Sequence, residues 1–234
     1  MLKSIRFACF AVFAFPLVAM AAVKPDPHFV QACEKNLPAA SVTLHALPYS
    51  VQQTAQMDVQ AITYHTKHTR NISTLASLGY TLAPSKSQIN NDGQVMNDVK
   101  NGVYCGSFTS EVSVGYAPVQ VIVADIYKPQ SCAYNTVLHH ENEHVSIFRD
   151  SISADKIAQL QASLNLNMTK VFYGASREEV LAQHEAYISK TLSAYFQTVY
   201  DMQASFDEHE DYDALMASCD GELKKALMER VRSI

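Results

Sequence analysis

Residues 140–144 read His140-Glu141-Asn142-Glu143-His144, an H-E-x-x-H motif. Two histidines four residues apart on a helix project from one face and can bind one zinc ion. Glu141 follows the first histidine directly, where its carboxylate can take a proton from water that the ion activates. The motif predicts a zinc-dependent hydrolase with His140 and His144 as metal ligands and Glu141 as general base.

The residues around the motif favour a real site over an accidental match. Apolar side chains at helical spacing place both histidines at the edge of a core-facing stripe; these are Val137, Leu138, Val145 and Phe148. Several ionisable groups on a half-buried face are costly without a counter-ion, which a metal would supply. His139 points about 100° away from His140 on a helix, so we expect it to flank the site.

The pattern before residue 130 is typical of strands, because Thr, Val and Tyr alternate there with polar residues. We expect strands over residues 41–51, 61–69, 102–116 and 117–127. The sequence NDGQV (residues 91–95) indicates a turn, and Gly115-Tyr116-Ala117-Pro118 a hairpin connection between the last two strands. His65 and His68 would then lie on opposite faces of the second strand, where they could not share a ligand.

The pattern after Pro129 is helical. Ser131 is a suitable N-cap for a helix over residues 132–150, and further helices are expected over 154–164, 176–204 and 212–231 with a possible break at Gly221. Strands followed by helices predict an α+β fold, with mainly antiparallel strands in a strand-rich part (40–127) and a helical part (131–231). We expect one domain over residues 22–234.

The segment from the strand APVQVIVADIY (117–127) through SC and VLHHENEH to residue 150 resembles the zincin metallopeptidases. It is most similar to small secreted bacterial zincin-like families. The resemblance covers residues 119–150 well and the N-terminal half hardly at all. It implies an edge strand beside the H-E-x-x-H helix that pairs with an extended peptide substrate.

The third zinc ligand is not settled by the motif. Ile147 and Asp150 stand where the metzincin pattern needs Gly and His, so that route is closed. The resemblance to gluzincins implies a glutamate on a later helix, and Glu185 falls within the apolar stripe of the helix over 176–204. Glu185 is therefore the predicted ligand, and a buried ion pair is the alternative role for it. The other candidates are Glu178, His184, Asp207 and His209.

The first residues indicate export. Lys3 and Arg6 precede an apolar run, and Ala19-Met20-Ala21 has the small-x-small form that signal peptidase accepts, so we expect a signal peptide over 1–21. The remaining chain has 16 basic and 23 acidic residues, a formal charge of −7, which argues against a nucleic-acid partner. The sequence predicts no membrane span and a periplasmic or secreted location.

Four cysteines remain after the predicted cleavage, namely Cys33, Cys105, Cys132 and Cys219. An even number in an exported chain suggests two disulfides, and three pairings are possible. Pairing within each half, Cys33 with Cys105 and Cys132 with Cys219, is favoured.

The sequence thus predicts an exported zinc metallopeptidase that hydrolyses peptides or proteins. The rival hypothesis is a non-catalytic envelope protein that keeps the fold to bind a partner, with a structural metal or none. No phosphate-binding loop, G-x-S-x-G elbow or dinucleotide fingerprint competes with these two.

Overall fold

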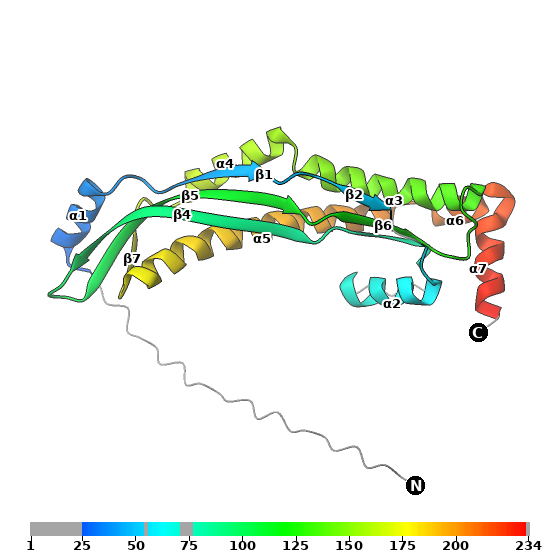
Figure 1. Cartoon of the computed structure of the whole chain (residues 1–234), viewed down its shortest axis with the longest axis horizontal. Helices are drawn as coiled ribbons and strands as arrows, with labels where there is room; N and C mark the ends of the chain where they lie inside the picture. The colour runs from blue at the N-terminus through cyan, green and yellow to red at the C-terminus, as the bar shows by residue number, and fades with distance from the viewer. Residues whose placement is uncertain (1–24, 54–55, 71–76, 233–234) are drawn as a thin grey trace, which may run out of the picture.

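The computed structural model of the chain describes residues 25–53, 56–70 and 77–232. The predicted signal peptide, residues 1–21, lies outside these ranges. The predicted α+β class is confirmed, since strands dominate the N-terminal half and helices the C-terminal half. Figure 1 shows an elongated molecule in which the longest helix, α5 (Arg177–His209), runs along the length of the strands.

Two small sheets carry the strands. One has the order β1-β5-β4, with β7 paired to β5 beyond that path, and the other has the order β2-β6-β3. Antiparallel pairing joins β4 to β5, β3 to β6 and β7 to β5, whereas β1 and β2 run parallel to their neighbours. The strands span Ser41–Ala46 (β1), Val51–Gln53 (β2), Gly79–Leu82 (β3), Ser85–Asp98 (β4), Val103–Tyr116 (β5), Val119–Val123 (β6) and Phe172–Gly174 (β7).

The two sheets are joined end to end through a bend at two facing prolines. Pro84 separates β3 from β4, and Pro118 separates β5 from β6, while the amide of Ala117 still donates to the carbonyl of Pro84 at 2.9 Å. Proline has no amide proton for the ladder, so hydrogen bonding is interrupted where the two strands bend. The predicted hairpin connection at residues 115–118 is therefore wrong, because β6 continues beyond β5 instead of folding back on it.

The predicted turn at residues 91–95 is also wrong, because all five lie within β4. Gly93 allows the ring of Phe108 on the neighbouring strand to approach the backbone of β4 closely, because a Cβ at this position would lie 2.3 Å from a ring atom of Phe108. The chain reverses later, between β4 and β5, where Gly102 has a φ of +63° that favours glycine.

The predicted strand over residues 61–69 is a helix, α2 (Val59–Arg70). Asp58 caps its start, since its side chain accepts from the amide of Gln60 at 2.8 Å. Val59 and Ile62, three residues apart, are both buried against β3 and β6. Burial at helical spacing thus outweighs the strand preference of the Thr and Tyr residues.

The helices after residue 130 agree with the predicted order, whereas α1 was not predicted. The helix that starts at Cys132 is α3, and Ser131 caps it as expected, accepting from the amide of Tyr134 at 3.1 Å. The predicted C-terminal helix is broken near Gly221 into α6, a short 3-10 helix and α7. The bounds are Pro27–Asn36 (α1), Cys132–Ser151 (α3), Ala154–Asn167 (α4), Tyr212–Ala217 (α6), Cys219–Gly221 (η1) and Glu222–Arg232 (α7).

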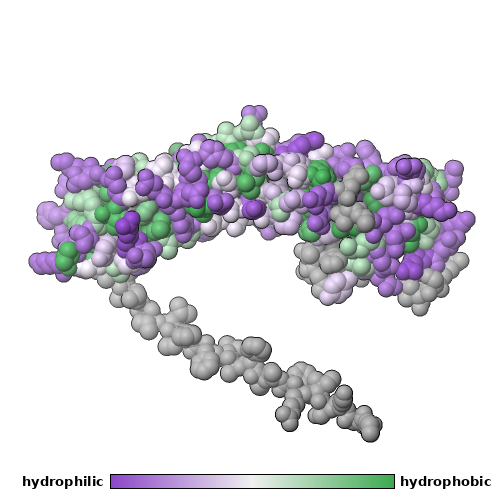
Figure 2. Space-filling model, viewed as in Figure 1, coloured by the Kyte–Doolittle hydropathy of each residue, from purple (hydrophilic) through white to green (hydrophobic). Residues whose placement is uncertain are grey.

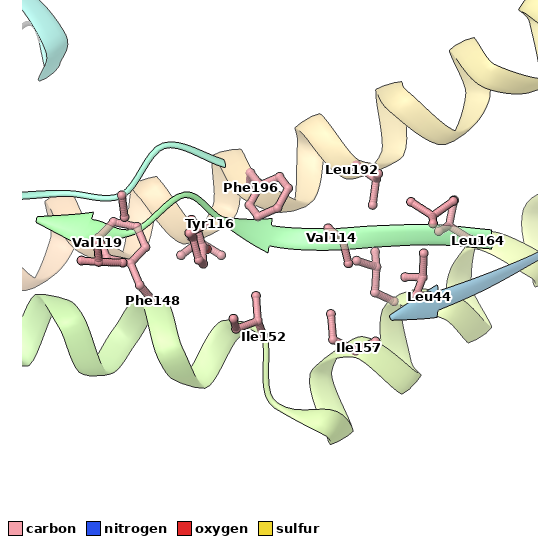
Figure 3. Close-up of a cluster of buried hydrophobic side chains, with 14 of the residues drawn as sticks. Leu44, Val114, Tyr116, Val119, Phe148, Ile152, Ile157, Leu164, Leu192 and Phe196 are labelled. Atoms are coloured by element: carbon pink, nitrogen blue, oxygen red, sulfur yellow. The ribbon is translucent and has the colours of Figure 1, made fainter. Parts of the chain in front are cut away.

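The largest core lies between one face of β5 and the helices α3, α4 and α5 (Figure 3). Val112, Val114 and Tyr116 alternate along β5 and so face the same side. The ring of Tyr116 meets Phe148 of α3 and Phe196 of α5 at centroid distances of 5.0 and 5.4 Å. This core fixes α3 and α5 relative to each other, and these two helices carry the site described below.

Two disulfides tie segments near the two ends of the chain to the rest of the fold. Cys33 of α1 is bonded to Cys105 of β5, and Cys132 of α3 to Cys219, the pairing that the sequence favoured. Such bonds persist outside the reducing cytoplasm. On the face in Figure 2, hydrophobic residues form separate patches between hydrophilic ones. Within the described ranges, no helix has both the length and the apolar character that crossing a membrane requires.

Candidate metal centre

The two motif histidines lie on one face of α3, as the spacing predicts, and their rings meet. Nε2 of His140 and Nε2 of His144 are 3.1 Å apart. The His144 residue is 1% exposed, and the side chain of His140 is 12% exposed. The position of the histidines at the border of the core follows from the apolar stripe of α3, which buries Val137, Val145 and Phe148.

A carboxylate from the far end of α5 completes a group of three. Oδ1 of Asp207 lies 2.9 Å from Nε2 of His144 and 3.4 Å from Nε2 of His140. The three atoms thus form a nearly regular triangle with sides of 2.9, 3.1 and 3.4 Å. Among the described residues, His140, His144 and Asp207 form the group of side chains that could hold a metal ion.

The triangle fits zinc. Ligands that bind a tetrahedral zinc at 2.0–2.1 Å stand about 3.3–3.4 Å from one another. A circle through the three atoms has a radius of about 1.8 Å, which is shorter than a zinc–nitrogen bond, so one ion can reach all three. Two imidazole nitrogens and one carboxylate oxygen are also a ligand set that zinc accepts, and it leaves a fourth position for solvent or substrate.

The other nitrogen of each histidine faces an acceptor. Nδ1 of His144 lies 2.5 Å from Oε1 of Gln203, and Nδ1 of His140 lies 2.6 Å from Oε2 of Glu210. A neutral imidazole that donates from Nδ1 presents a lone pair at Nε2. Both lone pairs then point toward Asp207. Three acceptor atoms that converge in a largely buried place need a proton or a metal ion between them, so the arrangement suits a metal.

Electrostatics at His140 agree with that argument. Burial lowers the pKa of its imidazole, but a hydrogen bond to Asp207 and the negative charges of Glu141, Glu210 and Asp207 outweigh burial and raise the pKa above its ordinary value. The negative field that favours a proton on His140 also favours a metal cation beside it.

Glu141 lies between the histidines and strand β3. Its Oε2 accepts a hydrogen bond of 2.7 Å from the hydroxyl of Thr81, and its residue is 4% exposed. The carboxylate also fits against Gly79, where a Cβ would lie 2.5 Å from Oε1. β3 is an edge strand and packs against α3, whereas β6, the predicted strand at 117–127, is the central strand of its sheet. The general-base candidate is thus held by the edge strand.

Glu185, the predicted third ligand, does not join the histidines. Its Oε1 accepts a hydrogen bond of 2.5 Å from the side-chain amide of Asn91 on β4. Glu185 and Asp207 lie 22 residues apart on one unbroken helix, a separation of about 33 Å at 1.5 Å per residue. Only one of them can reach α3's histidines, and the helix brings Asp207.

The other candidates also lie elsewhere. Glu178 is exposed in the first turn of α5, and His209 is exposed, with Nδ1 2.7 Å from the carbonyl of Ser205. His184 is buried, with Nε2 2.6 Å from the hydroxyl of Ser110. Gln203 and Glu210 were not considered from the sequence. Their spacing with Asp207, at i, i+4 and i+7 on one helical face, is the signal that would have found them.

The structure is thus a disulfide-bonded α+β chain in which two histidines and one carboxylate meet. Comparison of the chain with protein-family models, with curated proteins and with solved structures gives no match. The function must therefore be argued from the geometry of this centre.

Proposed function

We propose that the protein is an exported zinc-dependent peptidase whose zinc is held by His140, His144 and Asp207. The single observation that carries the proposal is the triangle of Nε2, Nε2 and Oδ1 atoms with sides of 2.9–3.4 Å. The apolar start of the chain and the two disulfides support a periplasmic or secreted location.

Each residue of the motif has a defined task in this proposal. Zinc bound at the triangle would supply a Lewis acid that polarises a peptide carbonyl and lowers the pKa of water. Glu141 takes a proton from the attacking water and delivers it to the departing amine. Thr81 holds the carboxylate of Glu141 in place, because its hydroxyl is 2.7 Å from Oε2. β3, as the neighbouring edge strand, is the element on which an extended peptide would pair.

A second candidate function is favoured by the burial of the site. Glu141 is 4% exposed and His144 1% exposed, which is also the pattern of a metal that only stabilises the fold. In this reading the protein is a non-catalytic envelope protein that binds a partner, and zinc is structural. The two candidates predict the same zinc content and differ in the role of Glu141.

The experiment uses residues 22–234 with both disulfides formed. Zinc content is measured together with hydrolysis of an unfolded protein, for the wild type, Glu141→Gln and the matched control Glu143→Gln, an exposed glutamate on the same helix. We expect one zinc per chain in all three and a loss of roughly 10²–10⁴-fold in cleavage for Glu141→Gln alone. Zinc in all three without cleavage supports the structural metal, and a wild type without near-stoichiometric zinc refutes both zinc hypotheses.

A further inference from the structure

The last turns of α5 present three acceptors to the two histidines of α3. Gln203, Asp207 and Glu210 stand at i, i+4 and i+7, so they share one face of the helix and its C-cap. Asp207 meets both Nε2 atoms, as described above. Gln203 and Glu210 lie on either side of it, and each meets the Nδ1 atom of one histidine.

The contact of Gln203 with His144 fixes which nitrogen carries the proton. Nε2 of the glutamine amide donates to the backbone carbonyl of His144 at 3.1 Å, and a carbonyl can only accept. The other end of the amide is therefore Oε1, which lies 2.5 Å from Nδ1 of the imidazole. An acceptor at that distance requires a proton on Nδ1. Gln203 is 2% exposed, so water does not compete for either bond.

Glu210 lies beside Nδ1 of His140, as Gln203 lies beside Nδ1 of His144, and Glu210 also carries a negative charge. Oε2 of Glu210 lies 2.6 Å from Nδ1 of His140, and the negative charge of the carboxylate favours a proton on that nitrogen. Both atoms are buried, and neither has a regular hydrogen bond to a described residue. Each of these atoms thus has the other as its polar neighbour.

Phe206 holds the two rings from a third side. Its ring stacks on His140 with a centroid distance of 5.3 Å and an interplanar angle of 26°, and meets His144 edge-on at 5.1 Å. The stacking on Phe206 and the neighbouring Glu210 restrain the ring of His140, while the Gln203 contact and the edge of Phe206 restrain that of His144. The orientation of each Nε2 lone pair is thereby set before any ligand arrives.

We propose that Gln203 and Glu210 are the positioning residues of the metal centre, an inference that rests on the proposed zinc site. Gln203 orients His144 and Glu210 orients His140, and each keeps the ring in the form that binds metal through Nε2. Acceptors behind ligating histidines commonly change metal affinity by about 10–100-fold. Glu210 also brings a negative charge, so its effect exceeds that of the neutral Gln203.

The test measures zinc affinity by competition with a chelator and the imidazole N–H signals of the zinc-loaded protein by NMR. We expect Glu210→Ala to lower affinity by about 10–100-fold and to remove the protected Nδ1–H signal of His140 alone. Gln203→Met, which preserves side-chain volume, removes that of His144 alone. Glu210→Gln, which keeps an acceptor, recovers part of the affinity lost in Glu210→Ala.

Glu208→Ala is the matched control, because Glu208 is an exposed carboxylate two residues away and its loss changes the net charge equally. Equal losses for Glu208→Ala and Glu210→Ala would show a general charge effect and overturn the positioning roles. If Gln203→Met does not fold, the Glu210 variants decide alone, since Glu210 lies just beyond the end of α5. Zinc binding by the wild type that no Gln203 or Glu210 variant weakens refutes this inference and leaves the zinc site intact; a wild type that binds no zinc refutes both.

Discussion

Acid should destabilise the protein through one buried histidine that lies far from the candidate metal centre. The ring of His184 is 0% exposed and lies beside two aromatic rings, Phe108 at 5.3 Å and Phe172 at 5.2 Å between centroids. Its Nε2 lies 2.6 Å from the hydroxyl of Ser110, and its Nδ1 is buried without a hydrogen-bond partner among the described residues. Burial lowers the pKa of His184 from 6.5 to about 4.

The sign and size of the effect follow from linkage. Below pH 6.5 the unfolded chain takes up a proton at this residue, while the folded protein does so only near pH 4. The free energy of unfolding is therefore unaffected above pH 6.5 and falls as the pH drops from 6.5 toward 4. A pKa difference of this size corresponds to about 3 kcal/mol in full, of which about 2 kcal/mol is lost by pH 5.

The perturbation is His184→Gln, which keeps a donor for Ser110 and removes the titrating group. Urea unfolding followed by circular dichroism, with a chelator present, compares the loss of stability between pH 7.5 and pH 5. We expect the wild type to lose about 2 kcal/mol more than His184→Gln over this interval. His28→Gln, at an exposed histidine, serves as control and should behave like the wild type. Equal losses in the wild type and His184→Gln would refute the reasoning.

Three further predictions concern the metal centre. Gly79→Ala puts a Cβ 2.5 Å from Oε1 of Glu141, so we expect cleavage of a peptide to fall far more than zinc content, and equal losses would contradict this. Asp207→Asn should weaken zinc binding at least tenfold in a chelator competition, whereas Glu185→Gln should leave it unchanged; the reverse result would restore Glu185 as ligand. Thr81→Val should cost about 1.5–3 kcal/mol in urea unfolding at neutral pH, because a hydrogen bond to a buried carboxylate is lost, and an unchanged midpoint would argue against that bond.

The sequence could predict those features of the fold that depend on neighbouring residues. The α3 helix follows from the cap at Ser131 and an apolar stripe of helical period, and the start at Cys132 is as expected. The approach of His140 and His144 follows from their spacing alone. The order of strands and helices also reads directly from composition, because strand-forming residues cluster in the N-terminal half.

The sequence could not predict those features of the fold that depend on contacts between distant segments. NDGQV has the residues of a turn, but Gly93 is needed for the ring of Phe108, and only the pairing of β4 with β5 brings them together. The Thr and Tyr residues of α2 favour a strand, whereas the cap at Asp58 favours the helix that forms. Both cases show tertiary contacts outweighing local preference.

The sequence favours Glu185 over Asp207 as the carboxylate beside the histidines for a related reason. Periodicity shows which face of a helix is buried, and both Glu185 and Asp207 are compatible with that face. It does not show which turn of a helix of 33 residues lies beside α3. The expected helix over 176–204 also ends before Asp207, although α5 extends to His209.

The length of α5 has an evolutionary consequence. No glycine or proline interrupts the helix, so the distance and the angle between its two ends are fixed. Near one end Glu185 is hydrogen-bonded to Asn91, and near the other Asp207 lies beside the histidines. Deleting one residue between Glu185 and Asp207 would rotate the C-terminal part of the helix by about 100° and shift it by 1.5 Å along the axis. Asp207 would then no longer face the histidines. Homologous chains should therefore tolerate substitutions along this stretch far more readily than gaps, because even a gap of seven residues, which nearly restores the direction of Asp207, shortens the helix by about 10.5 Å.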